Sequence, residues 1–170
     1  MSPSPFLIRF LAVGLLVALP VCAVAAETVG TVTNVQNQAQ IGGSAATVGT
    51  PVHMNDQLRT GPKSRLQITF RDQTLLTLGE NASVAVDRYA YNPDQSTGEM
   101  AVKATRGAMR FVTGKIGQMQ DHNVTVITPQ AALAVRGTDF WVGPINGHYG
   151  VLLLKGKVIV AGETPRGRKR

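Results

Sequence analysis

Residues 66–78 read Leu-Gln-Ile-Thr-Phe-Arg-Asp-Gln-Thr-Leu-Leu-Thr-Leu, and this stretch decides the fold class. Leu66, Ile68 and Phe70 alternate with polar residues, so an extended chain places all three on one face. Asp72-Gln73 separates this run from the next apolar run and is typical of a tight turn. The stretch therefore predicts a β-hairpin with one buried face. Gln73 would adopt a left-handed backbone, which costs on the order of 1 kcal/mol relative to glycine.

The same period of two extends outward from this hairpin in both directions. It predicts strands that bury Val84 and Val86; Met100, Val102 and Ala104; Met109 and Phe111; Val124 and Val126; and Phe140 and Val142. Residues 92–98 are polar and contain a proline, which predicts a longer connection between two of these strands.

Two turn signals follow residue 140. Asn146-Gly147 predicts a two-residue hairpin because both positions accept positive φ. Lys155-Gly156 predicts a further reversal into a short last strand, residues 157–161. Between the two turns, Val151-Leu152-Leu153-Leu154 predicts a central strand that is buried on both faces.

These patterns predict an all-β protein. We expect a single domain of roughly a dozen short strands, arranged as a sandwich or a solenoid-like stack of hairpins, with no helix after the leader. The chain has 170 residues, of which 44% are hydrophobic and 16% charged, a composition typical of a packed domain and not of a disordered chain.

Residues 1–26 have the pattern of a secretory signal peptide. Arg9 precedes an apolar run over residues 10–19, and alanines at 23, 25 and 26 provide a small-residue cleavage site. We therefore expect a periplasmic location, with the folded domain over residues 27–162 and a basic, disordered tail over residues 163–170. The alternative is an uncleaved N-terminal anchor.

Cleavage would also remove Cys22, the single cysteine of the chain. The mature protein would then have no thiol, which excludes disulfide, thiol-redox and cysteine-protease chemistry. A lipid-modified Cys22 is a third interpretation, disfavoured because Val21 stands where a small residue is usual. We expect no transmembrane helix in the mature chain, since no later apolar run is long enough.

The formal charge of +7 comes mainly from the two ends of the chain. Between residues 27 and 165 there are 12 Lys and Arg against 10 Asp and Glu, a balance of +2. The cations of this body are scattered and not interleaved with aromatic residues, so we expect no specific nucleic-acid binding.

The search for catalytic and ligand-binding patterns finds none. The three histidines, His53, His122 and His148, have no second ligand type at metal spacing, so we expect surface or turn histidines and no metal. There is no nucleophile elbow and no phosphate-binding loop. We therefore expect no catalytic residues, no cofactor and no enzyme. Convergence of His148 with a distant acid in one pocket would revise that expectation.

Two long phrases resemble the FecR-type domain. The first combines residues 48–52 (Val-Gly-Thr-Pro-Val) with residues 58–70 and 74–83. The second combines residues 128–131 (Thr-Pro-Gln-Ala) with residues 134–140 (Ala-Val-Arg-Gly-Thr-Asp-Phe). The resemblance spans nearly the whole mature chain. Two departures concern the backbone, because Gln73 and Ala134 stand where the family usually has glycine.

The resemblance implies an association with signalling. The FecR protein itself combines a cytoplasmic segment that engages a sigma factor, a membrane helix and a further periplasmic domain. This sequence resembles instead the stand-alone exported FecR-domain proteins, so we expect a module that does not itself relay a signal to transcription. We expect an envelope protein as partner. The alternative is a cell-wall or polysaccharide-binding module, for which 5% aromatic residues provide little support.

The motif residues are expected to be mainly structural, as turn and corner positions. They are Arg59, Gly61, Ser64, Arg65, Asp72, Thr74, Leu78, Gly79, Thr128, Pro129, Arg136, Gly137, Thr138 and Phe140. For Arg136 we consider a structural role, in which it binds loop carbonyls or an acid such as Asp139 or Asp72, and a functional one, in which it recognises the carboxylate or main chain of a partner. Trp141, His148 and Tyr149 are further candidate partner contacts, because they lie on the strands that flank Asn146-Gly147 and would give one face of that hairpin an aromatic patch. Core filling is the alternative for Trp141.

Overall fold

The computed structural model describes residues 26–162 and is an all-β domain. The predicted basic tail, and the predicted signal peptide apart from Ala26, lie outside the described residues. Among residues 26–162, no helix has the length and apolar character needed to cross a membrane. The all-β prediction is confirmed.

Thirteen strands form the sheet. They are β1 (Thr28–Gln36), β2 (Ala39–Ile41), β3 (Ser44–Ala45), β4 (Pro51–His53), β5 (Gln57–Thr60), β6 (Arg65–Phe70), β7 (Leu75–Leu78), β8 (Ser83–Asn92), β9 (Thr97–Arg106), β10 (Met109–Val112), β11 (Asp121–Ile127), β12 (Ala131–Ile145) and β13 (His148–Gly162). As predicted, the described residues contain no α-helix; a single 3-10 turn, η1 (Lys115–Gln118), precedes β11.

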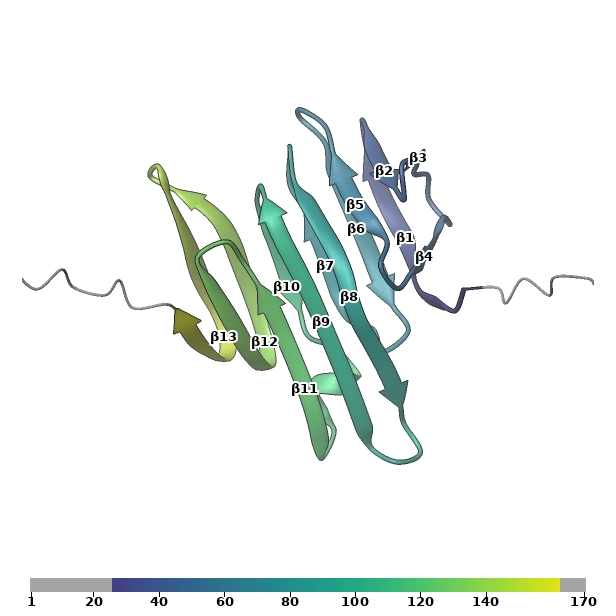
Figure 1. Cartoon of the computed structure of the whole chain (residues 1–170), viewed down its shortest axis with the longest axis vertical. Helices are drawn as coiled ribbons and strands as arrows, with labels where there is room; N and C mark the ends of the chain where they lie inside the picture. The colour runs from purple at the N-terminus through teal and green to yellow at the C-terminus, as the bar shows by residue number, and fades with distance from the viewer. Residues whose placement is uncertain (1–25, 163–170) are drawn as a thin grey trace, which may run out of the picture.

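The strands form one continuous sheet that curls back on itself, with the order β3-β2-β5-β8-β9-β11-β12-β10-β7-β6-β1-β4 and β13 paired with β12. All the pairs are antiparallel except β9 with β11. Figure 1 shows a front layer containing β8, β9 and β11 and a back layer containing β7 and β10. The sandwich expectation was therefore right about two layers, but one unbroken ladder joins them.

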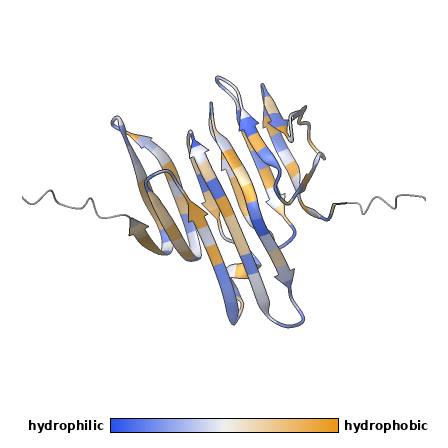
Figure 2. Cartoon of the chain, viewed as in Figure 1, coloured by the Kyte–Doolittle hydropathy of each residue, from blue (hydrophilic) through white to orange (hydrophobic). Residues whose placement is uncertain are grey.

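The core lies between the two layers and consists of the apolar residues that alternate with polar ones along the strands. Leu66, Ile68 and Phe70 are at most 1% exposed, as are Leu76 and Leu78 across the β6–β7 turn. Figure 2 shows hydrophobic bands that alternate with hydrophilic ones along the strands. The predicted inward residues of β8, β9, β10, β11 and β12 are likewise buried. Gln73 has φ of 67°, as predicted for the turn.

β12 belongs to both layers. Its first part pairs with β11 and its later part, from Asp139, pairs with β10. The change occurs at Gly137, whose φ is 56°, next to a shift in the register with β13. Glycine tolerates this left-handed backbone without a steric penalty, so the bend falls where the Arg-Gly-Thr phrase predicted a corner.

Two predictions for the last strand were wrong. Lys155-Gly156 does not reverse the chain, because β13 continues through it and Gly156 faces the β12 bend with φ of 91°. Nor is β13 a central strand, because it pairs with β12 alone among the described strands. The reversal at Asn146-Gly147, where Ile145 faces His148, is confirmed.

Candidate functional site

The buried carboxylate of Asp72 is the centre of the first motif. Its Oδ2 accepts from the Thr74 hydroxyl at 2.6 Å and from the Ile116 amide at 3.3 Å, and its Oδ1 accepts from the Tyr89 hydroxyl at 3.2 Å. The Tyr89 hydroxyl in turn accepts from the Asp72 amide at 2.9 Å. Asp72 and Thr74 are fully buried. These buried groups are therefore hydrogen-bonded to one another.

This network ties the back layer to the front layer. Tyr89 reaches it from β8, and its ring stacks on Phe70 of β6 with the centroids 5.6 Å apart. The Thr74 hydroxyl accepts from the Gly114 amide at 2.9 Å, which fixes the entry to η1. Burial, together with the nearby Asp72 carboxylate, raises the pKa of Tyr89. Every contact of Asp72 is thus with the fold itself.

Other motif residues make further contacts inside the fold. The Thr60 hydroxyl, next to the motif residue Gly61, donates to the Gly79 carbonyl at 2.6 Å. Ser64 Oγ donates to the Pro62 carbonyl and accepts from the Gln38 amide. Two further buried threonines of the motif are hydrogen-bonded within the fold: Thr138 to Thr113, and Thr128, which precedes Pro129, to Ala131. The apolar motif residues Leu78 and Phe140 lie in the core.

Three motif arginines, Arg59, Arg65 and Arg136, are exposed. Within residues 26–162 none of them forms an ion pair. The proposed pairing of Arg136 with Asp139 or Asp72 is wrong, because Arg110 holds Asp139 and the network above encloses Asp72.

The candidate contact residues do not share one face. Trp141 faces outward, opposite Leu152, whereas Tyr149 lies opposite Pro144 on the core side. Tyr149 is half-buried, and its hydroxyl donates to the Gly107 carbonyl at 3.0 Å. His148 is exposed and has the same outward parity as Trp141. The structure therefore brings His148 and Trp141 to one face but separates both from Tyr149, and Trp141 is not part of the core.

Six exposed apolar side chains lie along β13, the strand that was predicted to be buried on both faces. We call this surface the β13 edge. Its exposed apolar side chains are between 37% and 60% accessible: Val151, Leu152, Leu153, Leu154, Ile159 and Val160. Isolated exposed apolar residues are ordinary, but a contiguous set along an edge strand is characteristic of an interaction surface.

A polar groove of about 360 Å³ lies beside the second half of this edge. Arg136 and Lys157 face each other across β12 and β13, next to Ile159, and His122 and Asp121 of β11 form the opposite wall. The charged side chains of β13, Lys155 and Lys157, are both cationic. The edge thus combines apolar and positive character.

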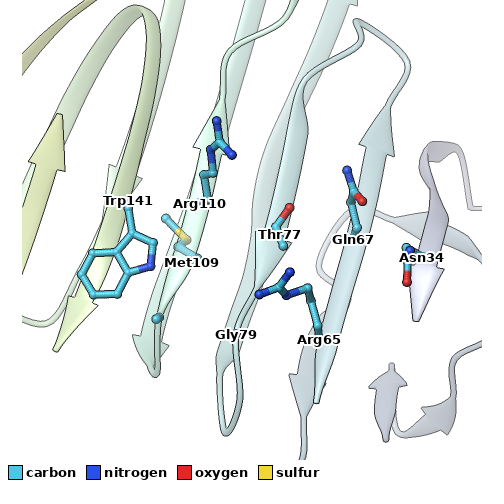
Figure 3. A pocket seen from close by; sticks show the side chains of 9 residues that line it. Asn34, Arg65, Gln67, Thr77, Gly79, Met109, Arg110 and Trp141 are labelled. Carbon is cyan, nitrogen blue, oxygen red and sulfur yellow. The ribbon is translucent and has the colours of Figure 1, made fainter. Parts of the chain in front are cut away.

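A second depression, which we call the outer trough, lies on the outward face of the back layer and has a volume of about 380 Å³ (Figure 3). Strand register aligns Asn34, Gln67, Thr77, Arg110 and Trp141 in one row across β1, β6, β7, β10 and β12. Beside this row, the small residues Gly79 and Ala108 also line the trough. Sequence reasoning missed the trough, because it depends on the register of five strands.

The charges of the outer trough are partly neutralised. Arg110 donates two hydrogen bonds to Asp139, at 2.9 Å from Nε and 2.6 Å from Nη2. These bonds lower the pKa of the Asp139 carboxyl and raise that of the Arg110 guanidinium. Arg65 has no such partner within the described residues and supplies a net positive charge.

The histidines do not converge. His53 lies 3.4 Å from Asp56, the Nδ1 of His122 lies 2.7 Å from the Met119 carbonyl, and His148 is exposed at the last hairpin. Within residues 26–162, no three His, Cys, Asp or Glu side chains gather in a way that could hold a metal ion.

Comparison with known proteins gives one family and one solved structure. None of the curated proteins is significantly similar to the chain. The crystal structure of a candidate anti-sigma factor from Parabacteroides distasonis ATCC 8503 is 20% identical, with a TM-score of 0.47. The match covers 63% of this chain and 47% of that one, so this chain spans less than half of its length. The model of the FecR protein family matches residues 56–159, which is more than half of the sequence, and the chain therefore belongs to the FecR family.

Proposed function

We propose that this FecR-family domain is an exported, periplasmic and non-catalytic module, which binds a signalling-associated envelope protein by strand addition at the β13 edge. The observation that carries the proposal is a 15-residue strand that has six exposed apolar side chains and, within residues 26–162, pairs along one side only. Its main-chain groups can pair with an incoming strand, and side chains on both faces can then pack against it. The signal-peptide pattern of residues 1–26 in the sequence supports the proposed location.

The edge also indicates the chemistry of the partner segment. Apolar side chains of β13 project to both faces, since Val151 faces Val142 of the core side and Leu152 faces the outward Trp141. Lys157 and Arg136 add positive charge next to Ile159. The complementary segment is an extended strand with apolar residues on both faces and acidic side chains near the two cations.

Photocrosslinking in cells tests the proposal. A photoreactive residue replaces Leu152 or Ile159 on the β13 edge, or Val48 as a control, which is 67% exposed in the connection between β3 and β4. We expect one identified envelope protein to be captured from both β13 positions and not from position 48. Lys157→Glu should weaken that capture, because it places an acid opposite acids. Equal capture at all three positions, or capture unaffected by Lys157→Glu, would contradict the proposal.

A further inference from the structure

The outer trough is separate from the β13 edge and presents a different chemistry. The strands that line it are paired on both sides, so an incoming strand finds no free main-chain ladder there. A ligand in the trough would be recognised by side chains and by the exposed face of the backbone. This difference favours a small, rigid, polar ligand over an extended peptide.

Gly143 of β12 leaves space for the Trp141 ring at one end of the trough. A Cβ added to Gly143 would lie 2.8 Å from the far edge of the indole ring and 2.6 Å from the Ala108 Cβ. Gly143 therefore allows the ring to lie over the strand. Figure 3 shows the indole at one end of the trough, with its nitrogen-bearing side toward β10, and the Arg65 guanidinium directed from β6 toward β7.

The polar groups of the trough are planar or hydroxylic. Thr77, Gln67 and Asn34 offer hydroxyl and amide groups, which suit the hydroxyls of a sugar. A half-buried indole can pack against the apolar C–H face of a sugar ring while its N–H remains free to donate. The volume of about 380 Å³ lies within the range of small-ligand sites.

Charge decides between a neutral and an acidic sugar. The bond to Asp139 occupies Arg110, whereas Arg65 keeps an unneutralised guanidinium within the part of the chain that the structure describes. A guanidinium matches the two oxygens of a carboxylate in a bidentate geometry. We infer that the outer trough binds a carboxylate-bearing saccharide, with Trp141 packed against the sugar ring and Arg65 bound to the carboxylate.

Fluorescence of Trp141 tests this inference directly, because the sequence contains a single tryptophan. The probe is a tetrasaccharide of alternating glucuronic acid and N-acetylglucosamine, and the neutral comparison is a tetrasaccharide of N-acetylglucosamine alone. We expect a saturable change with the acidic probe, binding at least about tenfold tighter than with the neutral one. Added salt should weaken it.

Variants locate the site. Arg65→Ala should reduce affinity for the acidic probe about tenfold, and Arg65→Lys should restore part of it, because the charge remains but the bidentate fork is lost. Arg59→Ala removes a comparable exposed arginine from β5 and should stay within about twofold of the wild type. Unchanged thermal unfolding shows that each variant is folded.

Three results would overturn the inference: no saturable change, equal affinity for both tetrasaccharides, or an equal effect of Arg59→Ala and Arg65→Ala. Glucuronic acid monomer that binds as tightly as the tetrasaccharide would restrict the site to one sugar ring and still support it. None of these results depends on the β13 edge, so failure here leaves the proposed protein interaction intact, and the reverse holds too.

Discussion

The β6–β7 hairpin and the β12–β13 hairpin are built from similarly apolar strands, but only the first is enclosed. β7 has β6 on one side and β10 on the other, and its inward Leu76 is fully buried. β13 has β12 on one side, and its Leu154 is 53% exposed. An apolar composition thus indicates that a strand is suited to pack against other apolar groups. The position of the strand in the sheet decides whether the chain itself provides those groups.

Removing the Asp72 carboxylate should have the largest effect on stability, because its hydrogen bonds connect the β6–β7 turn to the rest of the fold. Asp72→Ala leaves the Ile116 amide and the Thr74 amide without their acceptor in a dry interior. Each such loss costs about 1–3 kcal/mol, so we expect the free energy of unfolding to fall by about 3–5 kcal/mol in urea titrations. Asp94→Ala, in the exposed β8–β9 connection, should change it by less than about 0.5 kcal/mol. A change below about 0.5 kcal/mol for Asp72→Ala as well would contradict the structural role of Asp72.

The same truncation in both hairpins compares them directly. Leu76→Ala creates a cavity between the layers and should cost about 2–5 kcal/mol of unfolding free energy. Leu154→Ala removes a side chain that is half in water and should cost less than about 0.5 kcal/mol. Thermal and urea unfolding at low protein concentration check both values. A large loss for Leu154→Ala would mean that the β13 edge is already covered in solution.

Two glycines of the β12–β13 hairpin allow its bend to be compared with its turn: Gly156 lies at the bend and Gly147 in the turn. Both have positive φ, 91° at Gly156 and 82° at Gly147. A Cβ at Gly156 would lie 2.3 Å from the Gly137 carbonyl oxygen, whereas one at Gly147 meets nothing within 4 Å. Gly147→Ala should therefore cost about 1 kcal/mol, and Gly156→Ala about 1–3 kcal/mol more. Equal costs in urea unfolding would show that the bend relaxes freely.

The smallest effect is expected at the ion pair between β10 and β12, where the enclosed and exposed regions meet. Arg110 lowers the pKa of Asp139, so this carboxyl stabilises the fold above its unfolded pKa of about 3.9 and loses that contribution as pH falls through the lower folded value. Because Arg110 is 53% exposed, Asp139→Asn should cost less than about 1 kcal/mol at pH 7. Urea titrations at progressively lower pH should show this deficit shrinking as the pH falls below about 3.9, and a deficit that does not change with pH would contradict the assignment.

The sequence predicted local features, such as strands and turns, better than it predicted which strands lie next to each other in the sheet. Alternation over residues 66–70 determined which side chains are buried, and Asn146-Gly147 marked its turn, because both depend on the chain within a few residues. The position of β13 at an edge could not be read from Val151 to Leu154, since a buried strand and a strand awaiting a partner share the same composition. Lys155-Gly156 was predicted to be a turn, but β13 continues through Gly156 and only bends there. Glycine is compatible with both conformations, so its presence does not distinguish them.

The candidate sites depended on register, which the sequence does not encode in an obvious way. The outer trough needs Arg110 of β10 beside Trp141 of β12, and neither residue belongs to a recognisable pattern with the other. The ion pair of Asp139 shows the same dependence on register. Asp139 was one of the acids considered for Arg136, whereas the antiparallel pairing of β10 with β12 places Arg110 beside it.

The double membership of β12 has a consequence for the order of events in folding. Residues 131–145 connect the layer that ends in β11 with the layer that ends in β10, and they follow both in the chain. β10 and β11 therefore lack their common neighbour until β12 takes its place in the sheet. Until it arrives, each layer has an open rim, and neither can close over the other. The two layers are therefore expected to melt and form together, in one late and cooperative step.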